Sequence, residues 1–505
     1  MADPSVLIIG AGPTGLVLAL WLTRLGITVR IIDKAGTPGT TSRALAVHAR
    51  TLELYRQLDL ADAVVEQGYS VPGTRLWIRG REAARVPFEQ LVSDLTAYGF
   101  LHIFPQDEHE RLLITRLESA GVRVERQREL VGFTDHGEQI EARLRGPNGL
   151  EQRVACAFLA GCDGARSMVR QTLGAAFPGG TYPQVFYVAD VEGDGPAFNG
   201  DLNVDLDESD FLAIFPLADR GRVRLIGTIE GDEKTLEQLG FDDISDRATR
   251  SLQLRIRKVN WFSVYHVHHR VTEYFRRGRA FLLGDAAHIH TPVGGQGMNT
   301  GIGDAVNLAW KLKAVLSGSA PDALLDTYEA ERRAFAVRLV RTTDRFFNVA
   351  AAQGRLAELV RTRLAPFLLP QVVKLESARD WIFRTISQIT LNYRDHGLDE
   401  GHLGAIRGGD RMPWVRMASG DNYQTLQSID WKIHVYGTAH ADLEGWCREH
   451  ALPLHVYAWD PGFERVGLKA DAAYLIRPDT YIGLVQGQQD PKAIQRYFER
   501  LRIRP

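Results

Sequence analysis

The sequence has little cysteine and almost no net charge. Its 505 residues include three cysteines, Cys156, Cys162 and Cys447, whose spacing fits neither a disulfide framework nor paired metal ligands. So few thiols are typical of the reducing cytosol, and we expect a cytoplasmic protein without a metal site. The formal net charge of -2 gives no electrostatic reason to expect nucleic acid or an anionic membrane surface as a partner. We therefore expect a small-molecule partner.

A long uninterrupted apolar run is also missing. The apolar stretch 6–22 is interrupted by glycines and by Pro13, and Asp3 precedes it in place of a basic segment. This pattern predicts neither a signal peptide nor a membrane span. The contents of 45% hydrophobic and 24% charged residues are typical of a globular protein, and the length predicts roughly three domains.

The first informative motif lies within that apolar stretch. Residues 5–9 form a short run typical of a buried strand, and the next six residues fit G-x-G-x-x-G. A second strand-like run, 27–32, ends at Asp33. Such glycines permit a tight turn, close approach to a pyrophosphate and close helix packing, while the acidic residue accepts from a ribose hydroxyl. The pattern does not separate FAD from NAD, and a βαβ unit without a ligand stays open. The candidate cofactor-binding residues here are Gly10, Gly12, Pro13, Thr14, Gly15, Asp33 and Lys34.

Two later segments again place glycine and aspartate after an apolar strand. Residues 158–161 lead to Asp163, and residues 280–283 lead to Asp285, which we expect to meet a ribityl or ribose hydroxyl. A glycine-rich loop follows Asp285, and a helix is predicted from near Gly303, with a long helix over 323–347. Each segment taken alone also fits an ordinary strand-to-helix turn.

In this order, the three segments resemble those of the class A flavoprotein monooxygenases, the aromatic hydroxylases similar to p-hydroxybenzoate hydroxylase. The resemblance extends through residues 328–333 and covers nearly the whole chain. It implies that NADPH or NADH reduces bound FAD, that O2 forms a flavin C4a-hydroperoxide, and that this species hydroxylates a phenolic or polycyclic aromatic small molecule. Epoxidation, Baeyer–Villiger oxidation, N-oxygenation and flavin-containing binding without turnover stay open as alternatives.

The resemblance also implies cofactor contacts outside the first motif. Arg43 would reach the pyrophosphate, and Gln106 would contact the nucleotide portion of the flavin. Asp163 and Arg166 are candidates for contact with the nucleotide or the nicotinamide. The alternatives are a solvated loop arginine for Arg43, a surface amide for Gln106 and a structural ion-pair partner for Arg166.

The resemblance further implies that the glycine-rich loop lies beside the flavin ring. Pro292 would border the reacting position, glycines would leave room there, and backbone N-H groups from Gly297 to Asn299 would stabilise negative charge on reduced flavin. The alternative for Pro292 is a loop stiffener. The predicted cofactor contacts of this loop are Pro292, Gly295, Gly297, Met298 and Asn299.

Substrate contacts are predicted from aromatic residues on short strands. Phe186, Phe211 and Phe215 would line an aromatic pocket, together with Tyr265, although aromatic residues on strands are also common in plain cores. His48 is a candidate for assisting phenol deprotonation, and a structural histidine is the alternative. Pro292 and His48 are thus the catalytic candidates.

We expect an α/β fold with a Rossmann-like FAD-binding domain, and the resemblance implies that it carries a β-sheet substrate domain. The tail of the chain resembles the thioredoxin-like C-terminal domain of one branch of the family. Within the tail, strands are predicted at 432–436, 454–458, 473–477 and 481–485, and helices at 441–450 and 491–501. Cys447 is the only cysteine there, so a dithiol couple is excluded and packing or homo-oligomer formation is expected instead. The predicted boundaries are 1–70, 99–176 and 273–398 for the FAD-binding domain, 71–98 and 177–272 for the substrate domain, and 399–505 for the tail.

Overall fold

The fold is taken from a computed structural model of the chain. It describes residues 3–39, 44–78, 80–88, 95–205, 212–219, 221–229, 240–242, 252–291, 293–350, 383–384, 387–418 and 420–505. Three residues singled out from the sequence, Arg43, Phe211 and Pro292, lie outside the described residues.

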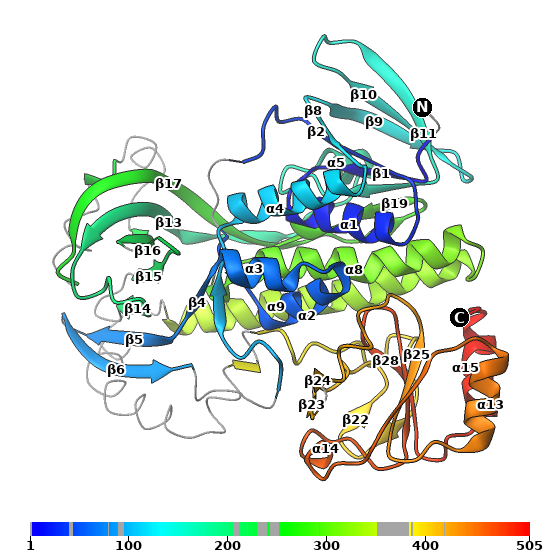
Figure 1. Ribbon diagram of the computed structural model, residues 1–505. Coiled ribbons are helices and arrows are strands. Elements are labelled where there is room, and N and C mark those ends of the chain that lie inside the picture. The colour runs from blue at the N-terminus through cyan, green and yellow to red at the C-terminus, as the bar shows by residue number, and fades with distance from the viewer. Residues whose placement is uncertain are drawn as a thin grey trace.

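A six-stranded sheet forms the centre of the nucleotide-binding part (Figure 1). Its order is β18 (Arg276–Arg277), β19 (Ala280–Leu282), β12 (Phe158–Gly161), β1 (Val6–Ile9), β2 (Val29–Asp33) and β8 (Val124–Arg126). All neighbours pair in parallel except β18, which lies antiparallel at the edge. All four residues of β1 are buried, as its continuous apolar sequence requires for a strand covered on both faces.

Two smaller sheets accompany this one. The first joins β9 (Glu129–Asp135), β10 (Ile140–Arg145) and β11 (Glu151–Cys156). The second joins β3 (Ala46–Val47), β7 (Leu101–Ile103) and β4 (Tyr69–Val71). Strand β3 matters for the site because it leads directly into His48.

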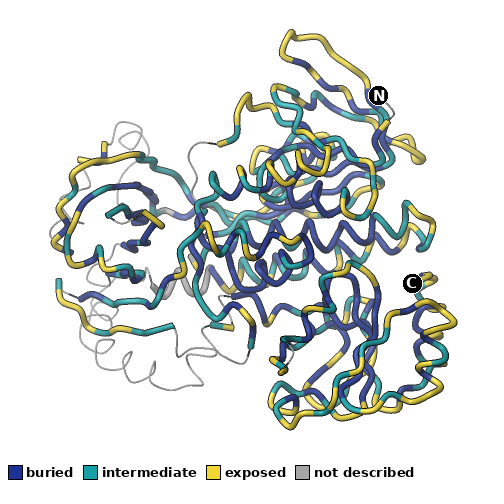
Figure 2. Tube along the Cα trace, viewed as in Figure 1, coloured by how far each residue is buried: buried dark blue, intermediate teal, exposed yellow. Residues whose placement is uncertain are grey.

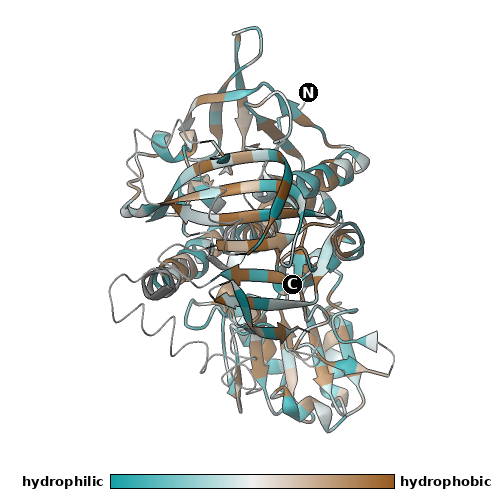
Figure 3. Ribbon diagram, turned by 90° about the vertical axis from the view of Figure 1, so that its left-hand side faces the viewer, coloured by the Kyte–Doolittle hydropathy of each residue, from teal (hydrophilic) through white to brown (hydrophobic). Residues whose placement is uncertain are grey.

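An eight-stranded sheet forms the second part, on the left of Figure 1. Its order is β20 (His288–Ile289), β17 (Arg255–Val271), β13 (Gly179–Asp194), β16 (Arg222–Ile229), β15 (Leu212–Pro216), β14 (Leu202–Asp205), β5 (Gly73–Ile78) and β6 (Arg81–Pro87). Hydrophobic and hydrophilic residues alternate along its long strands (Figure 3), as expected for a sheet with two different faces. Residues 71–98 and 177–272 are predicted to belong to one domain. The pairing of β5 with β14 and of β6 with β5 in this sheet is consistent with that prediction.

The helices cover the six-stranded sheet and connect the parts of the molecule. They are α1 (Pro13–Arg24), α2 (Ala49–Tyr55), η1 (Arg56–Leu58), α3 (Ala61–Gln67), α4 (Gln106–Ser119), α5 (Met168–Thr172), η2 (Gly284–Ala286), η3 (Val293–Gly295), α8 (Gln296–Leu316), η4 (Asp322–Leu325) and α9 (Asp326–Ala350). The helix predicted from near Gly303 begins seven residues earlier, because Gly295 takes a left-handed φ of 63° and ends the turn there. The helix predicted over 323–347 is α9, preceded by the 3-10 turn η4.

The C-terminal domain is built on a four-stranded sheet. Small hairpins precede it, β21 (His402–Leu403) with β22 (Ile406–Arg407) and β23 (Arg416–Met417) with β24 (Gly420–Asp421). The sheet and its helices are β25 (Lys432–Tyr436), α13 (Ala441–Glu449), β26 (Leu454–Tyr457), α14 (Gly462–Arg465), β27 (Ala473–Ile476), β28 (Ile482–Gln486) and α15 (Pro491–Leu501). Strand β25 pairs in parallel with β26 and antiparallel with β27, which pairs antiparallel with β28. These elements match the predicted ones to within about a residue, and their order is consistent with a thioredoxin-like fold, which stays a prediction.

The C-terminal domain docks on α8 and α9 through buried charges. Arg477 forms bidentate bonds with Glu331 of α9 at 2.5 and 3.0 Å and with Asp479 at 3.0 and 2.7 Å. Lys311 of α8 donates to the same Glu331 at 2.8 Å. Figures 1 and 2 show this domain against the two helices, with buried chain on both sides of the contact. Burial acts to raise the pKa of Glu331, but Arg477 and Lys311 outweigh it and lower that pKa to about 2.

We expect Arg477→Met to destabilise the protein strongly. The substitution leaves Glu331 and Asp479 buried with too few partners, which costs about 3 kcal/mol or more in the free energy of unfolding. Arg153→Met is the matched control, because the Arg153–Glu141 pair is exposed and such pairs contribute about 1 kcal/mol or less. Urea titration followed by circular dichroism measures both changes. Equal losses for the two variants would contradict the prediction.

Candidate functional site

The three glycine segments found in the sequence meet at one end of the six-stranded sheet. A Cβ atom on Gly10 would clash with the backbone of Cys162, and one on Gly15 would clash with the Gly10 carbonyl. A Cβ atom on Gly284 would lie 2.8 Å from Thr14 Oγ1, and one on Gly301 would clash with the same hydroxyl. The glycines are therefore required by close contacts within and between the segments, and Thr14 of the first segment packs against Gly284 and Gly301 of the third.

Gly12 differs from these glycines because a Cβ atom there would meet no atom of the described residues within 4 Å. It is the N-cap of α1, which has Pro13 in its first turn and no side-chain cap among the described residues. The backbone N-H groups of that turn therefore border open space at a helix N-terminus, where a phosphate group is favoured. This open cradle fits a pyrophosphate.

Asp33 closes the first motif at the end of β2. Its carboxylate accepts from the N-H groups of Ala11 at 2.7 Å and Ala35 at 2.8 Å, and Arg126 lies 3.8 Å from it. A carboxylate has further lone pairs, so these bonds orient Asp33 and leave it able to accept from a hydroxyl. Lys34 is exposed beside it.

Two charged residues, Glu110 and Arg126, lie close to Asp33, and Gln106 is bonded to the first of them. Gln106 begins α4 and donates to Glu110 at 2.7 Å, and burial raises the pKa of Glu110. Nη2 of Arg126 is buried without a hydrogen-bond partner in the described parts of the chain. An unsatisfied donor beside Asp33 is consistent with a ligand rich in acceptors at this end of the site.

The second segment is built around a helix cap. Asp163 accepts from the N-H groups of Met168 at 2.7 Å and Val169 at 3.2 Å at the start of α5, and burial raises its pKa. Arg166 is exposed in the same turn. The predicted nucleotide contacts of Asp163 and Arg166 stay predictions.

Sequence reasoning missed Arg170, which joins the second segment to the third. Arg170 is buried, and it donates to the Ala165 carbonyl at 2.7 Å and the Ala286 carbonyl at 2.9 Å. Its guanidinium lies 4.0 Å from the Phe177 ring centroid. Nothing in the local pattern distinguishes this arginine from a solvated one, because both carbonyl partners depend on the tertiary fold.

Asp285 is exposed at the end of β19, in the turn η2. The turn is held by Asp304 of α8, another residue missed from the sequence. The Asp304 carboxylate accepts from Gly284 N-H at 2.9 Å, His288 Nε2 at 2.7 Å and Arg332 Nε at 2.6 Å. Burial acts to raise the pKa of Asp304, but Arg332 and His288 outweigh it and lower the pKa. The fixed turn leaves Asp285 facing outward at the end of the strand.

The glycine-rich loop runs through η3 into α8. The Asn299 side chain accepts from His48 N-H at 2.9 Å and the Thr51 hydroxyl at 2.7 Å, and it donates to the carbonyls of Ala46 and Gly295 at 2.9 Å each. These four bonds engage its whole hydrogen-bonding capacity. Only the backbone of Asn299 is therefore left for a cofactor, which agrees with the predicted use of backbone N-H groups. Gly297 and Met298 are half-buried in the same first turn.

Two neutral histidines lie beside this loop. His48 bonds the Gly294 carbonyl through Nε2 at 2.9 Å, and His290 bonds the Thr291 carbonyl through Nδ1 at 2.8 Å. Burial lowers the pKa of each to about 4. Since a carbonyl only accepts, the bonded nitrogens carry the protons, and His48 Nδ1 and His290 Nε2 are acceptors without a partner in the described residues. His48 thus presents an acceptor of low basicity near pH 7, and its catalytic role stays a prediction.

One face of the eight-stranded sheet adjoins the loop. Phe186 is buried and stacks on Tyr265 with ring centroids 6.0 Å apart, and half-buried Phe215 lies on the same face. Ala46 of β3 belongs to this apolar cluster, and a Cβ atom on Gly295 would lie 2.8 Å from the Ala46 Cβ atom. The aromatic face therefore meets the glycine-rich loop through Ala46. We call this surface the substrate face.

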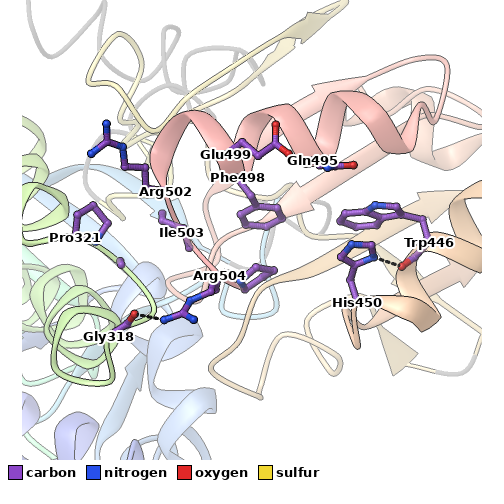
Figure 4. A pocket seen from close by; sticks show the side chains of 12 residues that line it. Gly318, Pro321, Trp446, His450, Gln495, Phe498, Glu499, Arg502, Ile503 and Arg504 are labelled. Atoms are coloured by element: carbon purple, nitrogen blue, oxygen red, sulfur yellow. Dashed lines mark hydrogen bonds between the residues drawn. The ribbon is translucent and has the colours of Figure 1, made fainter.

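A separate cavity of about 550 Å³ opens between α13, α15 and the turn after α8 (Figure 4). Trp446 and His450 stack on one side with ring centroids 4.2 Å apart, and Phe498 lies on another. Its lining contains none of the residues of the three glycine segments, so it is not part of this site.

No described helix combines the length and apolar composition that a bilayer crossing requires.

Comparisons with known proteins agree with this geometry. Residues 3–343 match the family model described as FAD binding domain. The chain is 37% identical over 401 residues to 6-methylpretetramide 4-monooxygenase of Streptomyces rimosus, covering 79% of this chain and 71% of that protein. It is 31% identical over 431 residues to pentachlorophenol 4-monooxygenase of Sphingobium chlorophenolicum, covering 83% and 77%. The solved structure of OxyS anhydrotetracycline hydroxylase from Streptomyces rimosus has a TM-score of 0.79 and 27% identity, with 100% of each chain covered.

The chain therefore belongs to the FAD-binding family of class A flavoprotein monooxygenases, and it is a flavin-dependent enzyme of the aromatic hydroxylase type. The family resemblance, the FAD cofactor and the α/β fold class predicted from the sequence are confirmed. The individual site residues stay predictions supported by the geometry above.

We expect Gly12→Val to weaken FAD binding roughly tenfold or more, because its side chain would fill the only open glycine position of the phosphate turn. Gly445→Val in α13 is the control, since a Cβ atom there also meets nothing within 4 Å. Flavin fluorescence titration of the apoprotein measures the two affinities. Wild-type affinity in the Gly12 variant would refute the pyrophosphate assignment.

We expect Asp285→Ala to weaken FAD binding by about tenfold to hundredfold, because a flavin hydroxyl loses a charged acceptor. The turn itself should remain in place, because Asp304 still accepts from Gly284 N-H. Asp442→Ala, at an exposed position of α13, is the control. Equilibrium dialysis with FAD measures retention, and flavin content equal to that of the control would contradict the assignment.

Proposed function

We propose that this enzyme hydroxylates a phenolic or polycyclic aromatic small molecule, using FAD, NADPH or NADH, and O2. The observation that carries the proposal is the contact between the substrate face and the glycine-rich loop through Ala46 and Gly295. An aromatic ring on that face would lie next to a cofactor held by the loop. The names of the relatives, which include a pretetramide and a chlorophenol monooxygenase, support a substrate of this class.

The N-terminal ends of two helices supply the electrostatics of cofactor binding. The first turn of α1 at Gly12 binds the pyrophosphate, with Arg43 as its proposed side-chain partner, and Asp33 and Asp285 accept from hydroxyls. The first turn of α8, from Gly297 to Asn299, would offer backbone N-H groups and the positive end of a helix dipole to the flavin ring. When bound, FAD supplies reduction by the nicotinamide and activation of O2.

The chain itself orients the substrate and excludes water. The buried ring of Phe186 and the half-buried rings of Phe215 and Tyr265 form an apolar wall. Apolar surroundings protect a reactive oxygen species from hydrolysis and other side reactions. We propose that His48 Nδ1 accepts a hydrogen bond from the substrate hydroxyl, which raises electron density on the ring.

The remaining assignments complete the proposal. We propose that Gln106 and Lys34 would contact the nucleotide portion of FAD, that Pro292 would border the reacting position, and that Asp163 and Arg166 would contact the nicotinamide nucleotide. We propose that the three predicted domains keep the boundaries given above, that the enzyme acts in the cytoplasm, and that the C-terminal domain serves packing or self-association.

The test is substrate-stimulated NAD(P)H consumption coupled to oxygen incorporation. We expect phenols and oxygenated polycyclic compounds to accelerate NAD(P)H oxidation by the flavin-loaded enzyme, with one atom of 18O2 appearing in the product. The Gly12→Val variant, low in flavin, is the control for non-enzymatic oxidation. A flavin-loaded enzyme that binds aromatic ligands and never incorporates labelled oxygen would overturn the proposal in favour of ligand binding without turnover.

A further inference from the structure

A buried ion pair interrupts the apolar substrate face. Arg224 of β16 and Asp190 of β13 form a bidentate pair, with Nε to Oδ1 at 2.6 Å and Nη2 to Oδ2 at 2.7 Å. The exposed fractions are 2% for the Arg224 side chain and 13% for the Asp190 side chain. The carboxylate is thus the more open member of the pair.

The sheet register fixes which way this pair faces. Residues two apart on a strand share a face, so Arg224 lies with Ile226, and Asp190 lies with Val188. Ile226 and Val188 belong to the apolar cluster that contains Ala46, whereas Val223 and Leu225 pack in a different cluster on the opposite face. The pair is therefore on the substrate face.

Aromatic residues flank the pair in register. Asp190 is opposite Arg224 on one side and Trp261 on the other, and Arg224 is opposite Phe215. The guanidinium carbon of Arg224 lies 5.6 Å from the Trp261 ring centroid. Trp261 and Phe215 are only half-buried, so the row from Trp261 to Phe215 borders accessible space.

Arg224 also has an unsatisfied donor. Its Nη1 is buried and has no hydrogen-bond partner within the described ranges. A buried ion pair is a weak source of stability, because desolvation offsets most of its attraction, and an orphaned donor adds a further cost. A purely structural role leaves this donor unexplained, whereas a ligand oxygen would satisfy it.

We propose that the Arg224–Asp190 pair recognises an oxygenated edge of the substrate. Arg224 Nη1 donates to a carbonyl oxygen of the ligand, and the Asp190 carboxylate accepts from a neighbouring hydroxyl. This inference rests on the proposed function and narrows its substrate class to planar polycyclic compounds that carry a carbonyl next to a hydroxyl.

The charge of the pair supports a neutral ligand edge. The guanidinium and the carboxylate cancel, so the pair offers one donor and one acceptor position without net charge. A ligand carboxylate would approach Asp190 against like-charge repulsion, whereas a hydroxyl and a carbonyl together match both positions. Arg224 and Asp190 are thus specificity-determining residues.

The test uses three planar probes of similar size with increasing oxygenation. Xanthene lacks the carbonyl, xanthone has it, and 1-hydroxyxanthone adds the neighbouring hydroxyl. The variant is the double substitution Arg224→Met with Asp190→Leu, which removes both charges and avoids an uncompensated buried charge. The matched control is Arg30→Met with Glu125→Leu, another bidentate pair, with distances of 2.6 and 2.8 Å, on β2 and β8. Perturbation of the flavin absorbance of each flavin-loaded protein gives the probe affinities.

We expect the wild-type protein and the control to bind 1-hydroxyxanthone more tightly than xanthone, and xanthone more tightly than xanthene. The double variant should lose roughly tenfold or more in affinity for both xanthones and keep its affinity for xanthene. Unchanged xanthene binding and flavin content show that the substrate face is still folded.

Two results would overturn the inference. The first leaves the proposed function intact, and the second overturns it as well. If the double variant keeps the wild-type order of affinities while aromatic probes still stimulate NAD(P)H consumption, the pair has no recognition role and the proposed function stands. If no aromatic probe binds or stimulates consumption in the flavin-loaded wild-type protein, the proposed function fails and the inference fails with it.

Discussion

Close contact between backbone segments is the constraint on which the rest of the structure depends. Gly10 touches the backbone at Cys162, and Gly284 and Gly301 both pack on the Thr14 hydroxyl, so that a side chain at any of these three glycines would clash. This contact aligns the ends of β1, β12 and β19, which are parallel neighbours. Because the neighbouring glycines are enclosed, Gly12 is the position of the turn that opens to a ligand. The contrast between filled and open glycine positions therefore supports the proposed pyrophosphate site at Gly12.

Adjacent charges on α9 link this cradle to the C-terminal domain. Arg332 bonds Asp304, which holds the turn at Gly284, while its neighbour Glu331 bonds Arg477. All four side chains are at most 1% exposed, so each depends on its partner for compensation of its desolvation. The C-terminal domain and the turn at Gly284 are thus both held by α9. A change in the Glu331–Arg477 contact is therefore expected to affect the turn at Gly284, because Glu331 and Arg332 are adjacent on α9.

Local sequence patterns predict the helices and strands, but they do not predict which distant side chains form hydrogen bonds with one another. The β1–α1–β2 unit and the strands of the C-terminal domain follow from apolar runs and glycine turns, which are properties of short segments. The start of α8 was placed too late because its glycines were interpreted as loop, although Gly295 at φ 63° already ends the turn. Arg170, Asp304 and the saturated side chain of Asn299 were not identified as structural links, since their bonds join residues up to 253 positions apart. Such pairs have no periodic signal in the sequence.

The polar groups near the substrate face differ between its two ends. Beside the glycine-rich loop, His48 Nδ1 and His290 Nε2 are buried acceptors without a partner in the described residues, and pKa values of about 4 keep both rings uncharged at neutral pH. Farther along the sheet, Arg224 presents an unsatisfied donor next to the Asp190 carboxylate. Between them lies an apolar and aromatic wall without net charge. An uncharged surface of this kind excludes ions on desolvation grounds and admits a flat apolar molecule with few hydrogen-bonding groups. Acceptors lie at both ends, since the Asp190 carboxylate is next to Arg224, whereas the unsatisfied donor lies only at the Arg224 end. Such a molecule is therefore expected to bind with a carbonyl toward Arg224.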